Sequence, residues 1–186
     1  DYTGNVTITG GASIAQLTAI DAAIIGNPTY STVSDTAANL AANTGGFVQN
    51  GKAVTLTSSH TLEELRLINN ATNQAITLAD ATVPLTGAAA DLVAALAGFT
   101  TYTGNITVTG SASIAQLAAI DAGTSGTITY GSVSDTAANL ATNAGGYVQN
   151  GKAVTITDAH DLAKLKAINN ATDQPITLAD NTVALN

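Results

Sequence analysis

Apolar and polar residues alternate over short runs of the chain, and apolar residues three positions apart follow each run. In the first of these runs Val6 and Ile8 alternate with threonines, and Ile14, Leu17 and Ile20 come next. Alternation over four or five residues predicts a short half-buried strand, whereas a three-residue spacing predicts one face of a helix. The pattern therefore predicts a β-strand followed by an α-helix.

The same pattern returns along the chain. Residues 6–20, "VTITGGASIAQLTAI", reappear as "VTLTSSHTLEELRLI" at 54–68 and as "ITVTGSASIAQLAAI" at 106–120. In each run a Ser or Thr stands three residues before a Gln or Glu, which fits a capping box at the start of a helix. Helices are therefore expected to begin after the first member of each pair: Ser13 with Gln16, Thr61 with Glu64, and Ser113 with Gln116.

Two further kinds of unit lie between these runs. Residues 29–46 recur almost unchanged as 129–146, and in them Asp35 and Asp135 are predicted as helix N-caps and the glycine pairs at 45–46 and 145–146 as helix stops. Residues 75–99 again change from an extended to a helical pattern. One period thus contains about four strand–helix units of 22 to 30 residues.

The larger repeat has a period of 100 residues. Shifting the 186-residue chain by 100 positions aligns Tyr2 with Tyr102 and His60 with His160 without a gap, and 58 of the 86 overlapping positions are identical. We therefore expect a first period over residues 1–100 and a second, shorter one over 101–186. Because the repeats are out of phase with the chain ends and the sequence has no methionine, an excerpt of a longer array is expected.

Units of this size cannot bury an apolar face alone, but stacked neighbours can. The sequence therefore predicts an α/β fold, a right-handed β/α solenoid of short strand–helix units similar to leucine-rich repeats, with parallel strands. One motif favours an alternative. Asn150-Gly151 lies between β-prone runs at 147–157, a pattern typical of a tight hairpin, and such a hairpin would make each period a compact α+β domain in tandem.

Charge and composition narrow the function. Charged residues make up 10% of the chain, and a net charge of −8 with five Lys and Arg leaves no basic patch for nucleic acid or anionic membranes. Without cysteine the chain has neither a disulfide nor a thiolate site. The longest apolar stretch, residues 88–99, is too short to span a bilayer, so no membrane insertion is expected.

Threonines occupy the polar positions of the predicted strands. On a stacked parallel sheet they would form a ladder on one exposed face, a surface-binding arrangement that resembles the ice-contacting faces of some antifreeze solenoids. The β-propensity of threonine explains the same pattern without a ligand. The ladder consists of Thr7, Thr9, Thr55, Thr57, Thr107, Thr109, Thr155 and Thr157.

Other candidate ligands and reactive groups are few. Six aspartates near element ends are candidate calcium ligands, although capping explains them equally well: Asp21, Asp35, Asp80, Asp121, Asp135 and Asp180. His60 and His160 are expected as exposed residues at helix entries, and the aromatics Tyr30, Phe47, Tyr130 and Tyr147 as core residues or ligand contacts.

Reactive side chains do not recur in register. The carboxylates at 63 and 64 become Ala163 and Lys164 in the second period, so no acid–base pair is repeated. We therefore expect no enzyme activity and, calcium apart, no cofactor.

The phrases "SVSDTAANLA", "ASIAQLAAIDAGTSGTITY" and "LKAINNATDQPITL" resemble modules of very long, Ala- and Thr-rich bacterial surface proteins of the adhesin, S-layer or matrix type. The resemblance implies a secreted or cell-surface location and a non-enzymatic role as scaffold, spacer or adhesive module. Partners would be neighbouring repeats and further copies of the chain. The alternative is a binding module that presents a repeated face to a glycan, a surface or ice. Members of this class often bind calcium, but their Gly-Asp nonapeptides are missing here.

Overall fold

The computed structural model describes residues 2–182, and the fold over these residues is α/β, with parallel sheets and seven helices. The chain divides into two compact units. Unit 1 comprises Asp1–Val83 and Ala94–Thr103, and unit 2 comprises Pro84–Val93 and Gly104–Asn186. Helix α4 (Ala89–Leu96) contributes residues to both.

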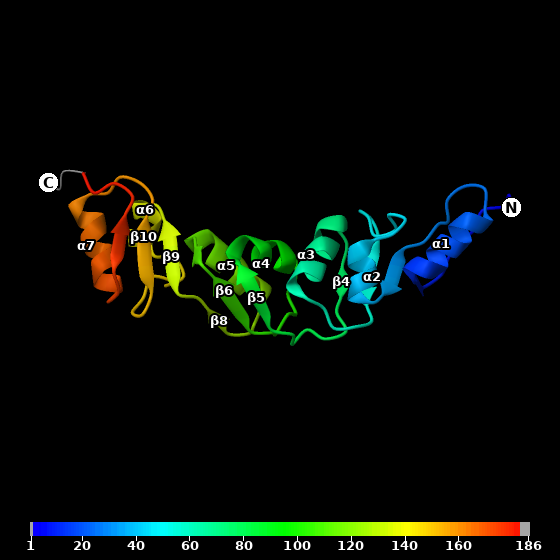
Figure 1. Cartoon of the computed structure of the whole chain (residues 1–186), viewed down its shortest axis with the longest axis horizontal. Helices are drawn as coiled ribbons and strands as arrows, with labels where there is room; N and C mark the ends of the chain where they lie inside the picture. The colour runs from blue at the N-terminus through cyan, green and yellow to red at the C-terminus, as the bar shows by residue number, and fades with distance from the viewer. Residues whose placement is uncertain (1, 183–186) are drawn as a thin grey trace. The chain divides into compact units, whose positions relative to one another are not determined.

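Unit 1 contains one four-stranded sheet in the order β1-β2-β3-β4, with every neighbouring pair parallel. Strands and helices alternate along the chain, and α2 and α3 lie side by side (Figure 1). The elements are β1 (Gly11–Ala12), α1 (Ile14–Ala23), β2 (Thr32–Asp35), α2 (Ala37–Ala42), β3 (Ala53–Leu56), α3 (Leu62–Ala71) and β4 (Ile76–Thr77).

Unit 2 contains two parallel sheets, with the orders β5-β6-β8 and β7-β9-β10-β11. Besides the start of α4, its elements are β5 (Leu85–Ala88), β6 (Ile106–Thr109), β7 (Ser111–Ala112), α5 (Ile114–Gly123), β8 (Ile128–Thr129), β9 (Ser132–Asp135), α6 (Ala137–Thr142), β10 (Ala153–Ile156), α7 (Leu162–Ala171) and β11 (Ile176–Leu178).

Paired strands are separated by nearly constant lengths of chain. Gly11 pairs with Thr32, 21 residues later, and Val54 pairs with Ile76, 22 residues later. The second period repeats both spacings. A parallel neighbour needs a crossover connection, and between the two strands of every pair in these sheets the connection contains a helix of six to ten residues.

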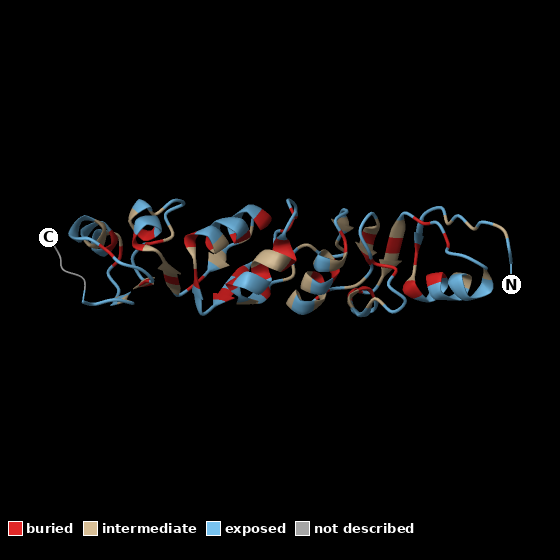
Figure 2. Cartoon of the chain, turned by 90° about the horizontal axis from the view of Figure 1, so that it is seen from above, coloured by how far each residue is buried: buried red, intermediate tan, exposed pale blue. Residues whose placement is uncertain are grey.

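The core of unit 1 lies between the sheet and its helices. Val33 and Val54 from the strands and Leu17, Leu40 and Ile68 from the helices are at most 1% exposed. Figure 2 shows α1 exposed over most of its length beyond the first turns, consistent with burial of Ile14 and Leu17 alone. The predicted three-residue spacing thus selects the buried side of each helix.

Capping boxes form at the three predicted pairs and fix these helix starts. In each of them the N-cap hydroxyl accepts a hydrogen bond from the N3 amide, and the N3 side chain accepts one from the N-cap amide. The predicted caps at Asp35 and Asp135 are wrong by one residue. Thr36 and Thr136 are the N-caps, because the preceding aspartate still belongs to the strand.

The predicted glycine stops also shift. Helix α2 ends at Asn43, which adopts the left-handed conformation with φ 45°, and Asn143 does the same after α6. The Asn43 side chain binds both the amide and the carbonyl of Val48, which stabilises the residue in this conformation. Gly45 and Gly46 follow the stop and have positive φ themselves.

The hairpin considered at Asn150-Gly151 does not form. The dipeptide makes a turn, closed by Lys152 N–H to the Gln149 carbonyl at 3.1 Å, but β10 after it pairs in parallel with β9 and β11. A strand is also missing at residues 6–9, where only Thr7 bridges Thr29, although residues 106–109 form β6.

Candidate functional site

The threonines of the predicted ladder lie at the surface, in register with further hydroxyl residues. Thr107 pairs with Thr86 on one side and Thr129 on the other, and Thr155 lies between Ser134 and Thr177. Six of the eight are exposed, while Thr55 and Thr155 are half-buried. Neighbouring strands lie about 4.8 Å apart, so each sheet carries a short row of hydroxyl and methyl groups at that spacing.

The candidate calcium ligands are dispersed, and several already bind the protein. Asp35 accepts hydrogen bonds from the amides of Ile14 and Thr36 and from the Asn39 side chain. Burial raises the pKa of the Asp35 carboxyl, but these three bonds outweigh it and hold the pKa below its ordinary value. Asp135 makes the same three bonds in unit 2.

The remaining aspartates of the set stand apart from one another. Asp80 and Asp180 each bind the amide and hydroxyl of the threonine two residues later, which fixes a local turn. Asp21 and Asp121 are exposed. Over residues 2–182, no three His, Cys, Asp or Glu side chains gather closely enough to hold a metal ion.

Both histidines are buried, which corrects the prediction of exposed helix-entry residues. His60 is 5% exposed and His160 6%. In unit 1 the His60 Nε2 lies 3.3 Å from the Tyr102 hydroxyl, and the two rings meet edge to face. Burial lowers the pKa of His60, against the charges of Asp80 and Glu64, so the imidazole is neutral.

A lysine–tyrosine contact occurs in both units, and it was not predicted from the sequence. The Lys52 ammonium donates a hydrogen bond to the Tyr30 carbonyl at 2.7 Å and lies 4.4 Å from the centre of the Tyr30 ring. Lys152 and Tyr130 repeat the contact. The signal was available, since these are two of only five cationic residues and they recur in register.

The tyrosine of this contact is a core residue. Tyr30 is 6% exposed, its hydroxyl donates to the Phe47 carbonyl at 2.9 Å, and Gln49 donates to the same hydroxyl. Burial raises its pKa. Tyr130 repeats these bonds with the Tyr147 carbonyl and Gln149. Core packing, one of the two roles predicted for these aromatics, therefore holds for Tyr30, Phe47 and Tyr130, while Tyr147 is half-buried.

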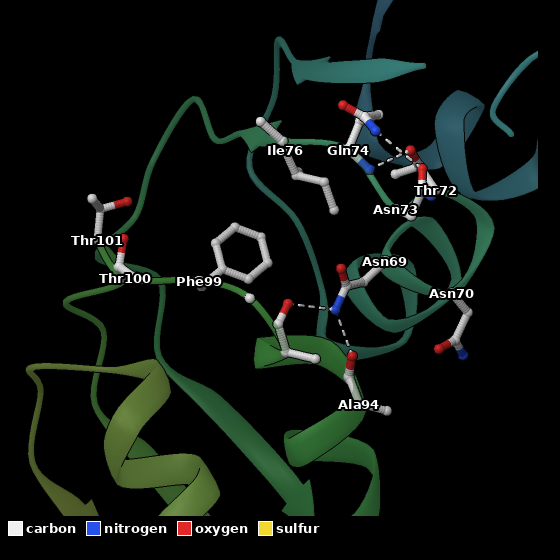
Figure 3. A pocket seen from close by; sticks show the side chains of 13 residues that line it. Asn69, Asn70, Thr72, Asn73, Gln74, Ile76, Ala94, Phe99, Thr100 and Thr101 are labelled. Atoms are coloured by element: carbon white, nitrogen blue, oxygen red, sulfur yellow. Dashed lines mark hydrogen bonds between the residues drawn. The ribbon is translucent and has the colours of Figure 1, made fainter. Parts of the chain in front are cut away.

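A cavity in unit 1 lies between residues 69–76 and 94–101 (Figure 3). Its wall carries the amides Asn69, Asn70, Asn73 and Gln74 together with the ring of Phe99. Asn69 points across to the end of α4, where its Nδ2 donates to the Ala94 carbonyl at 2.7 Å. The lining offers uncharged hydrogen-bonding groups but no titratable side chain for acid–base chemistry.

No family model matches the chain, and neither the curated proteins nor the solved structures that were searched include a similar one. Within residues 2–182, no helix has the length and apolar character needed to cross a membrane.

Proposed function

We propose that the chain is a non-enzymatic structural repeat module of a large extracellular or cell-surface protein, in which strand–helix units stack as a β/α solenoid and serve as scaffold or spacer. In such an array each unit binds its sequence neighbours and covers their apolar faces. The strand orders support this arrangement, because most strands pair with their neighbours in sequence and the spacing stays at 21 or 22 residues.

The proposal rests on a set of polar contacts between successive strand–helix units, and these contacts recur in both periods. Asp35 binds the amide of Ile14, 21 residues earlier; Lys52 binds the carbonyl of Tyr30, 22 residues earlier; and Thr72 binds the carbonyl of Lys52, 20 residues earlier. The second period makes the same three bonds from Asp135, Lys152 and Thr172.

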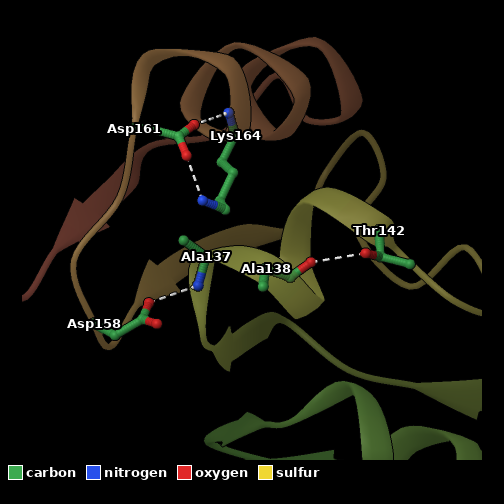
Figure 4. A network of polar contacts seen from close by, with 6 residues as sticks. All are labelled: Ala137, Ala138, Thr142, Asp158, Asp161 and Lys164. Atoms are coloured by element: carbon green, nitrogen blue, oxygen red, sulfur yellow. Dashed lines mark hydrogen bonds and ion pairs between the residues drawn. The ribbon is translucent and has the colours of Figure 1, made fainter. Parts of the chain in front are cut away.

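These bonds occupy side chains that would otherwise be candidates for ligand binding. Figure 4 shows a further case, in which Asp158 accepts from the amide of Ala137, the first residue of α6, as Ser58 does from Ala37 in unit 1. A carboxylate near a helix start also interacts favourably with the helix dipole. These polar side chains therefore support the proposal that successive strand–helix units are joined to one another.

Fractionation of cells that produce the full-length protein tests the location. We expect the protein in the surface or extracellular fraction, and recovery in the cytosol alone would contradict the proposal. Small-angle scattering tests the solenoid, because a compact 186-residue globule has a radius of gyration of about 16 Å and a solenoid a clearly larger one.

The exposed threonine rows favour a second function, a binding module for a glycan or an ice surface. The row Thr86-Thr107-Thr129 is the longest one that consists of threonine alone. If this function holds, Thr107→Val and Thr129→Val reduce retention on a glycan array or inhibition of ice recrystallisation, while Thr142→Val on α6 leaves both unchanged. Blank results for the unmodified chain in both assays would remove this alternative.

A further inference from the structure

Helices α3 and α7 hold equivalent positions in the two periods but differ in how they are covered. Leu65 in α3 is fully buried, whereas its counterpart Leu165 in α7 is only half-buried. Leu162, at the start of α7, is 50% exposed. Ile168 is as fully buried as its counterpart Ile68, so α7 packs on its own unit, and the residues that are less covered in α7 are Leu162, Leu165, Lys166 and Asn169.

Residues 94–103 of the same chain contact the elements around α3 in unit 1. The side-chain amide of Asn69 donates to the carbonyls of Ala94 at 2.7 Å and Ala97 at 3.0 Å, as Figure 3 shows for Ala94. Phe99 is 8% exposed and contacts Tyr102 edge to face. The end of α4 and the residue after it are thus joined to α3 by the hydrogen bonds of Asn69, and the Phe99–Tyr102 contact lies within the segment itself.

The same segment completes the surroundings of His60. Tyr102 is 1% exposed, its hydroxyl donates to the Val83 carbonyl, and its ring lies against the imidazole with the centroids 5.9 Å apart. Next to it, the Thr103 amide donates to the Ala81 carbonyl at 2.9 Å. Residues 94–103 therefore bind both α3 and the connection at 81–83 between β4 and β5.

The equivalent groups of unit 2 lack these contacts within residues 2–182. Asn169, the counterpart of Asn69, is exposed and its side-chain amide makes no hydrogen bond there, and no tyrosine ring lies against His160. The α7–β11 face is a hollow lined by Leu162, Leu165, Lys166, Asn169, Ile176 and Leu178. Asp161 and Lys164, which are next to Leu162 and Leu165 in the sequence, pair with each other (Figure 4).

We propose that the α7–β11 face is a docking surface for a polypeptide segment with the sequence of residues 84–103, "PLTGAAADLVAALAGFTTYT", supplied by a further repeat. This inference rests on the proposed function and names the partner of one face. The segment offers carbonyls at a helix end for Asn169 and a tyrosine for His160, the counterparts of its contacts with Asn69 and His60, and its apolar residues can cover Leu162 and Leu165.

Charge supports the same partner. Asp91 is the one charged residue of the segment, and Lys166 is the charged residue that lines the face. Opposite charges at the rim of an apolar contact favour the correct orientation and disfavour others.

A synthetic peptide of residues 84–103 titrated into the full chain by calorimetry tests the proposal. We expect saturable binding that Leu162→Ser weakens about tenfold, because one buried leucine contributes that much to an apolar contact. Leu67→Ser is the matched control. Leu67 is an exposed leucine on α3, 40% accessible, so its replacement leaves binding unchanged.

A second experiment joins the segment covalently to the chain, so that its result does not depend on the affinity of a free peptide. Residues 87–103 are appended after Asn186, with and without alanine in place of the appended tyrosine. The tyrosine-containing extension is expected to shift the ring resonances of His160 and to raise the urea midpoint, and the alanine version to shift His160 less. An extension that alters neither quantity overturns the proposal.

The outcomes also separate this inference from the proposed function. Absence of peptide binding and of any effect of the extension, in a protein found at the cell surface, overturns the docking surface alone. Binding that Leu162→Ser and Leu67→Ser weaken equally also overturns it. Specific binding in a protein confined to the cytosol contradicts the proposed location and leaves the docking surface standing.

Discussion

The first strand–helix segment of each period has nearly the same sequence and a very different environment. Tyr2 is 60% exposed, whereas Tyr102, in the same place 100 residues later, is 1% exposed. Ile106 is fully buried and Val108 is 5% exposed, whereas residues 6 and 8 are half-buried. Residues 106–109 form β6 between β5 and β8, while the equivalent residues of the first period make a single bridge.

Burial at these positions therefore comes from the adjacent segment. Leu17 and Leu117, which face their own unit, are fully buried in both periods. Tyr102 differs from Tyr2 because residues 81–83 and 99 lie against it. The stability of this segment contains terms from its own residues and terms from the residues next to it, and the two copies allow these terms to be measured separately.

The largest expected effect is at the tyrosines. Tyr102→Ala removes a buried ring and leaves the Val83 carbonyl without its donor, so the free energy of unfolding falls by about 3 to 5 kcal/mol. Tyr2→Ala, at the equivalent exposed site, changes it by less than about 0.5 kcal/mol. Urea unfolding followed by circular dichroism measures both, and equal losses in the two variants would contradict the comparison.

The second largest effect is expected at the equivalent leucines of α3 and α7. Leu65→Ala opens a cavity at a fully buried position and lowers the free energy of unfolding by about 2 to 5 kcal/mol. Leu165→Ala, at a half-buried position, costs about 1 kcal/mol. Hydrogen exchange of α3 and α7 assigns each loss to its helix. A loss for Leu165→Ala as large as that for Leu65→Ala would show that α7 is covered in solution.

Local features of the fold could be predicted from the sequence because they depend on residues close together in the chain. The capping boxes at Ser13, Thr61 and Ser113 need only a hydroxyl and an acceptor three residues apart. The alternation at 53–56 gave β3 and its buried side for the same reason. The contact between His60 and Tyr102 could not be predicted, since the two residues lie 42 positions apart in the sequence.

Contacts at the candidate site could not be predicted either, because they join residues that are distant in the sequence. The sequence predicted Asp35 at a helix start. Its hydrogen bond with the Ile14 amide depends on the parallel pairing of residues 21 positions apart in β1 and β2, and the hydrophobic pattern does not specify that pairing. The Lys52 contact with Tyr30 likewise depends on the parallel pairing of β2 with β3. The only signal of these contacts in the sequence is that the residues that make them are identical in the two periods.

A third prediction concerns features that ought not to differ between the copies. Ser13→Ala and Ser113→Ala each remove an N-cap hydroxyl that accepts from the amide three residues later at 3.1 Å. Each is expected to lower the free energy of unfolding by about 1 kcal/mol. Thr replacements at both sites serve as controls that keep a hydroxyl. A difference between the two alanine variants much larger than the error would show that neighbours affect even local capping.

The smallest expected effect is a pH dependence from His60. Burial lowers the pKa of this histidine in the folded state despite the opposing charges of Asp80 and Glu64, and the neighbouring Tyr102 stays neutral because burial raises its own pKa. An unfolded histidine titrates at about pH 6.5. As the pH falls below that value the unfolded chain binds the proton first, so the free energy of unfolding decreases between about pH 7 and 5. His60→Gln is expected to flatten this slope in urea unfolding while the slope due to the carboxylates, at lower pH, remains. An unchanged slope in the variant would mean that the imidazole is accessible to protons in the folded chain, and that the contact with Tyr102 opens without unfolding.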